Sequence, residues 1–131
     1  MKQNKQKQYA GVWLDNDNAM IIANTSENDV ADYTIQDKLK AREARGGGSE
    51  HSMNNAKHSD SLKYFKALSG LLLNYDEILV FGPGKSQEQF QNHLQEDAQF
   101  NSKKITIDSA EHLTDPQMIA KVREFFKSRQ S

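Results

Sequence analysis

The fold class of this chain is decided by the stretch Glu77-Ile78-Leu79-Val80-Phe81-Gly82-Pro83-Gly84 and by the residues that follow it. A short, continuous apolar run is typical of a strand that is buried on both faces of a parallel sheet. The Gly-Pro-Gly turn ends that strand. Ser86 and Gln89 then predict a capping box, and Phe90 and Leu94 supply the inward face of a helix. The sequence therefore predicts a buried strand followed directly by a helix.

Two further helices and one more strand are predicted around this unit. Ser59 is expected to cap a central helix over residues 59–74, because apolar residues recur there at three- and four-residue spacing. Residues 104–108 are typical of a strand, and Asp115-Pro116 opens a final helix. The two apolar stripes are Leu62, Phe65, Leu68 and Leu72 in the central helix, and Met118, Ile119, Val122, Phe125 and Phe126 in the final one. Tyr64 lies off its stripe, where it is expected to pack beneath the preceding loop or to contact a partner.

The first third of the chain is typical of three strands. Residues 9–14 and 19–23 are short apolar runs joined by the turn residues 15–18, which predicts a hairpin. Val30, Tyr33 and Ile35 mark a weaker third strand. Right-handed crossovers would place the fourth and fifth strands parallel to one edge of this antiparallel meander. The predicted fold class is therefore α/β, with a five-stranded mixed sheet in the order βββ-αβαβα flanked by three helices.

Composition limits the classes of protein to which the chain can belong. Its 131 residues are 36% hydrophobic, which suits one domain over residues 9–129 after a polar basic tail at residues 1–8. The absence of cysteine excludes disulfides, thiolate nucleophiles and cysteine-based zinc sites. No apolar signal segment or membrane-length stretch is present, so we expect a cytoplasmic protein with no membrane partner. The four histidines have no spacing that places two ligands on one helix face, and we expect no metal or other cofactor.

The chemistry-bearing segment is a glycine-rich loop predicted over residues 38–58. At its centre lie Arg45, Gly46, Gly47, Gly48 and Ser49. Three successive glycines let the backbone approach a partner without a Cβ in the way. The basic residues of the segment are Lys38, Lys40, Arg42, Arg45 and Lys57, against the acids Glu43 and Glu50. This excess of positive charge predicts an RNA-binding surface, with a merely solvated surface loop as the alternative.

These features together resemble the middle domain of archaeal and eukaryotic class 1 peptide-chain release factors, and especially their small bacterial relatives. The element order, the glycine-containing loop between third strand and first helix, and the Val80–Gly84 strand and turn carry the resemblance, over roughly Tyr9 to Lys127. It implies a ribonuclease-H-like fold and a ribosomal partner, either ribosomal RNA or tRNA, with no DNA. It also implies a role in the rescue of stalled ribosomes or in dormancy.

One residue of the motif departs from the family. The release factors carry Arg-Gly-Gly-Gln-Ser in this loop; the chain matches it at Arg45, Gly46, Gly47 and Ser49, while Gly48 stands in place of the glutamine. In the family the glutamine lies against the ester bond of peptidyl-tRNA, where it helps to position water and to stabilise charge on the leaving oxygen. Gly48 keeps the backbone amide and lacks the side chain. We therefore expect no efficient peptidyl-tRNA hydrolysis.

The sequence leaves three alternatives open. Gly84, Lys85 and Ser86 could hold one anion at a helix start, although Leu79 stands where a nucleotide-binding loop needs its first glycine. Asp15 and Asp108, with Asp60 or Asp115 as helpers, could build a metal-dependent nuclease or phosphohydrolase site. Turn formation and helix capping explain these acids equally well. A protein-binding module that pairs through the edge of the third strand is the third alternative.

Overall fold

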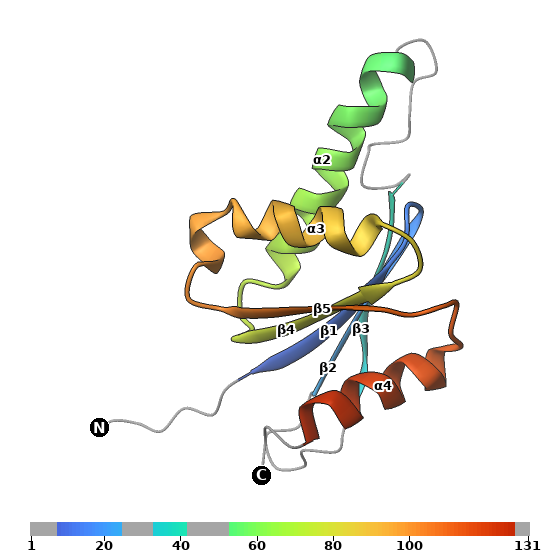
Figure 1. The fold of residues 1–131 in the computed structure, drawn as a ribbon, viewed down its shortest axis with the longest axis vertical. Helices are drawn as coiled ribbons and strands as arrows, with labels where there is room; N and C mark the ends of the chain where they lie inside the picture. The colour runs from blue at the N-terminus through green and yellow to red at the C-terminus, as the bar shows by residue number, and fades with distance from the viewer. Residues whose placement is uncertain (1–7, 25–32, 42–52, 128–131) are drawn as a thin grey trace.

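The computed structural model describes residues 8–24, 33–41 and 53–127, with only the backbone of residues 53–61. Five strands form one mixed sheet (Figure 1). They are β1 (Tyr9–Leu14), β2 (Asn18–Asn24), β3 (Tyr33–Lys40), β4 (Glu77–Gly82) and β5 (Lys104–Ser109), in the spatial order β3-β2-β1-β4-β5. The first three pair antiparallel, whereas β4 pairs parallel with both β1 and β5. The predicted five-stranded mixed sheet is confirmed.

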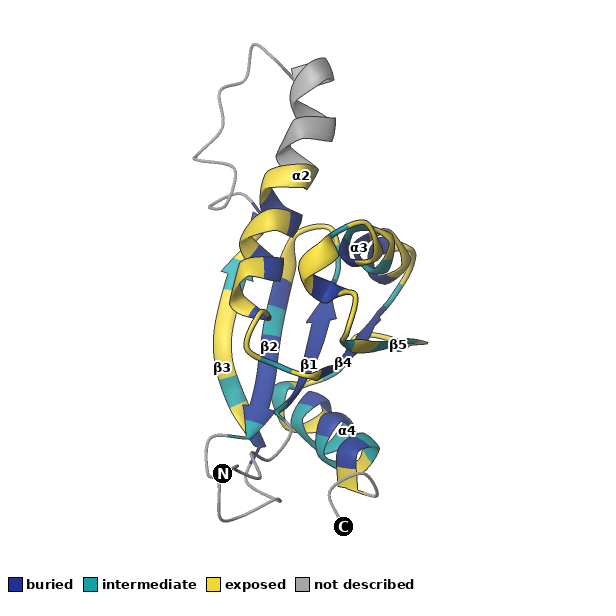
Figure 2. Cartoon of the chain, turned by 90° about the vertical axis from the view of Figure 1, so that its left-hand side faces the viewer, coloured by how far each residue is buried: buried dark blue, intermediate teal, exposed yellow. Residues whose placement is uncertain are grey.

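Three helices cover the two faces of this sheet. α2 (Met53–Leu71) and α3 (Ser86–Gln95) lie on one face and α4 (Asp115–Lys127) lies on the other, with the short 3-10 helix η2 (Ala98–Phe100) after α3 (Figure 1). Every residue of β1 and β4 is buried, because both strands lie inside the sheet and under helices on both sides (Figure 2). No helix in the described part of the chain is long and apolar enough to cross a membrane.

The start of α2 differs from the sequence prediction. The helix begins at Met53, so Ser59 lies inside it and is not its cap. The apolar stripe is also shifted, since Leu62 is 42% exposed whereas Tyr64 is only 3% exposed and belongs to the core with Phe65 and Leu68. The carboxyl-terminal part of α2 lies over the sheet, and its amino-terminal part extends beyond it (Figures 1 and 2).

The predicted capping box of α3 is wrong. Lys85 occupies the N-cap position without a side-chain hydrogen bond, and Ser86 is already the first helical residue. The Ser86 hydroxyl instead donates to Asn16 Oδ1 at 2.6 Å. A reciprocal cap does occur in front of α4, where Thr114 N donates to Gln117 Oε1 at 2.9 Å and Gln117 N donates to Thr114 Oγ1 at 3.3 Å. The cap of this helix is thus Thr114, one residue before the predicted start.

Candidate nucleic-acid interface

The motif residues lie in the connection between β3 and α2. Arg42 and the tract Arg45–Ser49 fall outside the described residues, while β3 ends at Lys40 and α2 begins at Met53. The segment between these two elements is therefore shorter than the loop predicted over residues 38–58. Lys38 and Lys40 belong to strand β3, and Lys57 belongs to helix α2.

The structure separates two of the predicted RNA-binding residues from the others. Lys38 Nζ lies 3.4 Å from Asp115 Oδ2 at the start of α4, which places it on the α4 face of the sheet. Lys40 shares that face, since side chains two residues apart in a strand point the same way, and Leu39 between them packs into the opposite, α2-side core. The lysines of β3 are thus directed away from the face that α2 covers.

Three elements converge on residues 15–17, which we name the β1–β2 turn. Ala41 N, directly after β3, donates to Asp17 O at 2.8 Å. The Tyr64 hydroxyl, in α2, donates to Asp15 O at 3.1 Å. The Ser86 hydroxyl, at the start of α3, donates to Asn16 as described above. Both elements that flank the motif-bearing connection are therefore fixed to the same turn.

The turn itself is held by its own side chain. Asp15 Oδ1 accepts hydrogen bonds from Asp17 N at 2.8 Å and from Asn18 N at 2.7 Å, which is an Asx turn. Burial, and then the Asp15 and Asp17 carboxylates, raise the pKa of the Tyr64 hydroxyl, so it remains a protonated donor. The sequence predicted the turn correctly, whereas its three anchors join residues 24 to 70 positions apart and left no local signal.

One of the three residues of the predicted anion site is engaged in the same contacts. Gly84 adopts a positive φ of 90°, which the turn into α3 requires and which glycine adopts without strain. Lys85 is exposed beside it. The buried Ser86 hydroxyl donates its hydrogen bond to Asn16. Ser86 therefore holds α3 against the β1–β2 turn.

The structure does not bring the predicted nuclease carboxylates together. Asp15 follows β1 and Asp108 lies in β5, with β4 between them, so the two backbones are separated by two strand spacings, about 10 Å. Asp108 Oδ2 accepts from Lys121 Nζ at 3.0 Å, and this hydrogen bond lowers the pKa of the carboxyl group. Asp115 faces Lys38, and the Asp60 side chain lies outside the described residues. Among the described residues no group of three histidines or acids could hold a metal ion.

The fold is shared with proteins of known structure. Pelota from Thermoplasma acidophilum aligns over 95% of this chain with a TM-score of 0.57 and 17% identity, and Pelota from Archaeoglobus fulgidus over 95% with 0.55 and 10%. The archaeal translation termination factor aRF1 aligns over 89% with a TM-score of 0.51 and 14% identity. No protein-family model and no curated protein matches the sequence. The chain covers 33% to 36% of these neighbours, so it has the fold of about a third of a Pelota or aRF1 chain.

Proposed function

We propose that this chain is a small release-factor-like protein that binds the ribosome in the cytoplasm, in the rescue of stalled ribosomes or in dormancy. One coincidence carries the proposal. The fold is that of a part of Pelota and of a translation termination factor, and the Arg45–Ser49 tract lies between β3 and α2, where the release-factor resemblance requires its Gly-Gly-Gln loop.

The proposed contact surface consists of Arg42, Arg45, the three glycines and Lys57. Positive side chains neutralise phosphates, and glycines permit a close approach of the backbone. Lys38 contributes less, because it faces Asp115 on the α4 side of the sheet. The shared anchoring of β3 and α2 at the β1–β2 turn supports this assignment, because it ties the strand and the helix that the connection joins to one point of the fold.

Binding to purified ribosomes at several salt concentrations tests the surface. Replacing Arg42, Arg45 and Lys57 together by alanine should weaken binding and flatten its salt dependence, since each lost phosphate contact lowers the log-log slope by somewhat less than about 1. The matched control replaces Lys104, Arg123 and Lys127, which removes the same charge from β5 and α4. Equal loss in both triple variants would show that net charge, and not this surface, determines binding.

Gly47→Val tests the glycines separately. It adds a β-branched side chain without changing charge, so it should weaken ribosome binding while leaving the salt slope unchanged. Wild-type binding by Gly47→Val would remove the glycines from the contact surface.

The proposed lack of efficient hydrolysis rests on Gly48. A backbone amide alone supplies one donor to the developing charge, and loss of one such donor group typically costs about 100- to 1,000-fold in rate. Purified protein added to ribosomes that carry peptidyl-tRNA should therefore release little peptide beside a complete release factor. Robust release by the wild-type chain would contradict the assignment of Gly48 as a disabling replacement.

A further inference from the structure

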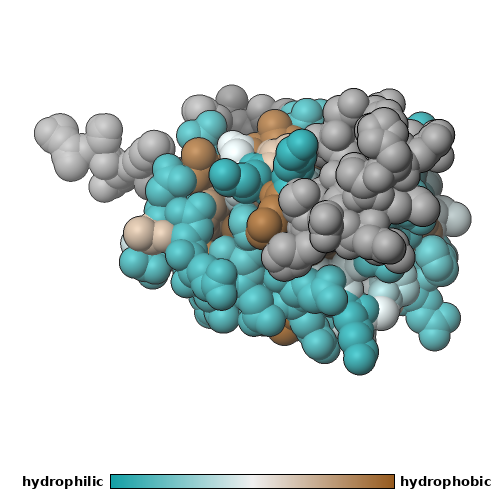
Figure 3. Space-filling view, turned by 90° about the horizontal axis from the view of Figure 1, so that it is seen from above, coloured by the Kyte–Doolittle hydropathy of each residue, from teal (hydrophilic) through white to brown (hydrophobic). Residues whose placement is uncertain are grey.

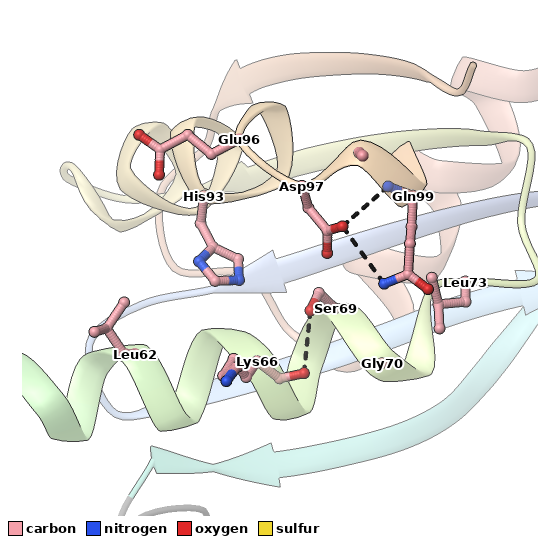
Figure 4. A pocket seen from close by; sticks show the side chains of 10 residues that line it. Leu62, Lys66, Ser69, Gly70, Leu73, His93, Glu96, Asp97 and Gln99 are labelled. Atoms are coloured by element: carbon pink, nitrogen blue, oxygen red, sulfur yellow. Dashed lines mark hydrogen bonds between the residues drawn. The ribbon is translucent and has the colours of Figure 1, made fainter. Parts of the chain in front are cut away.

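Two surfaces of the described chain are open to solvent beside α3. The first is a groove of about 510 Å³ between α2 and the end of α3, which Lys66, Glu96 and Asp97 line with charges of both signs (Figure 4). Mixed charges of this kind do not select one class of partner. Seen from above, the described surface carries small groups of hydrophobic side chains among hydrophilic ones (Figure 3). The second surface is the outer edge of β5, where backbone groups are exposed.

β5 is a regular strand at the edge of the sheet. Within the described residues it pairs with β4 alone, and it lies at the margin of the sheet opposite β3 (Figure 2). At the β3 edge, the pairing with β2 shifts register between Ile21 and Ile22, an irregularity that disfavours the addition of another strand. The pairing of β5 with β4 continues without a shift from Lys104 to Ser109. β5 is therefore the edge better suited to accept another strand.

The outward backbone groups of β5 belong to Ile105 and Ile107. Lys104 N donates to Asp76 O at 3.1 Å, so this N–H group points toward β4. Because successive residues of a strand direct their N–H and C=O groups to alternate sides, those of Ile105 and Ile107 point away from β4. Ser109 N, the next outward donor, is already bonded to the carboxylate of the preceding residue at 2.8 Å. The open part of the edge is thus short and centred on residue 106.

We propose that β5 pairs antiparallel with β5 of a second copy of this chain, in a two-fold symmetric dimer that joins the two sheets. An axis at Thr106 places residue i opposite j and j opposite i. Ile105 then lies opposite Ile107 of the second copy, and the two residues exchange both of their backbone hydrogen bonds. Their half-buried side chains meet on the face of the sheet where Ile105 already packs against the core.

Side-chain charge selects this register. Lys104 and Asp108 are both exposed, and they lie at equal distances on either side of Thr106. In the dimer each Lys104 lies directly opposite Asp108 of the other copy, on the face where Asp108 also accepts from Lys121 of its own chain. Moving the axis by one residue in either direction would leave Lys104 without an acid opposite it. This self-complementarity favours a second copy over a partner with a single sign of charge.

The dimer should be weak. Lys104 and Asp108 are four positions apart, so the paired segment is only about 14 Å long at about 3.4 Å per residue. For an interface this much smaller than the usual size we expect a dissociation constant on the order of 10 to 100 µM. Sedimentation velocity across that range should show a monomer–dimer equilibrium, whether or not the proposed ribosomal function holds. A wild type that is monomeric at about 500 µM would overturn the proposal.

Lys104→Glu tests the charge pair. It should weaken self-association about tenfold, because both of the cross-strand contacts become like-charged. Lys40→Glu is the matched control: it makes the same change of charge at an exposed position of β3, the opposite edge of the sheet, and should dimerise like the wild type. Circular dichroism verifies that both variants are folded. Equal weakening in the two variants would contradict the proposed contact.

Mixing two variants tests whether the pair forms between copies. Asp108→Lys alone should also weaken self-association, since it places two lysines opposite each other. An equimolar mixture with Lys104→Glu restores an opposite charge at both contacts of a mixed dimer. Dimer in the mixture, at a concentration where each variant alone is monomeric, supports the proposal. A mixture that remains monomeric contradicts it.

Single cysteines test the register, because the chain has no cysteine of its own. Thr106→Cys places two thiols opposite each other at the axis, where a Cα separation of about 4.5 Å suits a disulfide. Ser109→Cys places them three positions from the axis on opposite sides, too far apart to join. With an oxidant present, Thr106→Cys should form the covalent dimer at least about tenfold faster than Ser109→Cys. Equal rates would show that the two strands do not pair in this register and would overturn the proposal.

Discussion

Tyr64 is the residue that joins α2 to the β1–β2 turn, through the hydrogen bond from its hydroxyl to the Asp15 carbonyl oxygen. Tyr64→Phe keeps the ring in the core and removes this bond. We expect the free energy of unfolding to fall by about 1 kcal/mol, measured by urea denaturation. Leu68→Ala, which opens a cavity at a fully buried position of the same helix, should cost about 2 to 5 kcal/mol. Unchanged stability of Tyr64→Phe would show that the bond contributes nothing.

Two glycines predict opposite effects for the same substitution. Gly70→Ala adds a Cβ to open space within a helix and should stabilise the protein by about 0.5 to 1 kcal/mol. Gly82→Ala would bring its Cβ against the Leu14 carbonyl oxygen of β1, and because backbone cannot move aside cheaply we expect a loss of about 2 kcal/mol or more. Thermal unfolding of both variants checks the sign. Equal effects would contradict the packing of β4 on β1.

His93 makes stability depend on pH. Burial lowers the pKa of His93 from its ordinary value of 6.5; Asp97 and Glu96 oppose that shift and Lys66 adds to it. The folded protein therefore binds the imidazole proton less tightly than the unfolded chain. The contribution of neutral His93 to the free energy of unfolding is present above pH 6.5 and is lost as the pH falls through the lower pKa of the folded protein. Thermal unfolding at about pH 7.5 and about pH 5 should show a larger loss in wild type than in His93→Gln. Equal losses of stability in the two proteins would contradict a lowered pKa of His93.

At the scale of elements, the start of α4 is fixed by its reciprocal cap. Thr114→Ala removes the oxygen that accepts from Gln117 N and should lower the free energy of unfolding by about 1 kcal/mol. Asp115→Ala is the control, because its pair with Lys38 is exposed and worth little. Urea denaturation of the two variants compares them. A larger loss for Asp115→Ala would mean that charge, and not the cap, determines where α4 begins.

The elements differ in how far the sequence alone could predict them. β4 was predicted correctly because its continuous apolar run and the Gly-Pro-Gly turn at its end are both local signals. The predicted beginning of α2 was wrong. Ser59 is a good cap in isolation, and capping rules do not indicate whether the residues before it continue the helix. Tyr64 lies in the core where Leu62 was expected, and its hydroxyl donates to a carbonyl 49 positions away, a contact that no spacing within the helix indicates.

The candidate site was predictable only in part. The basic composition of residues 38–58 was evident from the sequence, but strand alternation directs Lys38 and Lys40 to the α4 face, and a bulge between Ile21 and Ile22 in the β2–β3 pairing determines which residues of β3 share that face. The groove between α2 and the end of α3 escaped prediction because the residues that line it come from two separate segments of the chain.

At the scale of the whole molecule, the layers determine where the elements that flank the motif lie. α2 and α3 cover one face of the sheet and α4 the other, and the amino-terminal part of α2, which follows the connection that bears Arg45 to Ser49 in the sequence, extends beyond the sheet (Figure 1). The same architecture aligns with two Pelota proteins and aRF1 at 10% to 17% identity. The fold is thus shared at low sequence identity, and the ribosomal role is our proposal.

Sedimentation of a cell lysate through a sucrose gradient, with detection of this protein in each fraction, tests that role most directly. The account predicts that the wild-type chain migrates with ribosomal particles. The triple replacement of Arg42, Arg45 and Lys57 by alanine should shift it to the top of the gradient, while the matched triple control on β5 and α4 stays with the particles. A wild-type chain found only at the top of the gradient, under conditions of ribosome stalling as well as growth, would contradict the central claim.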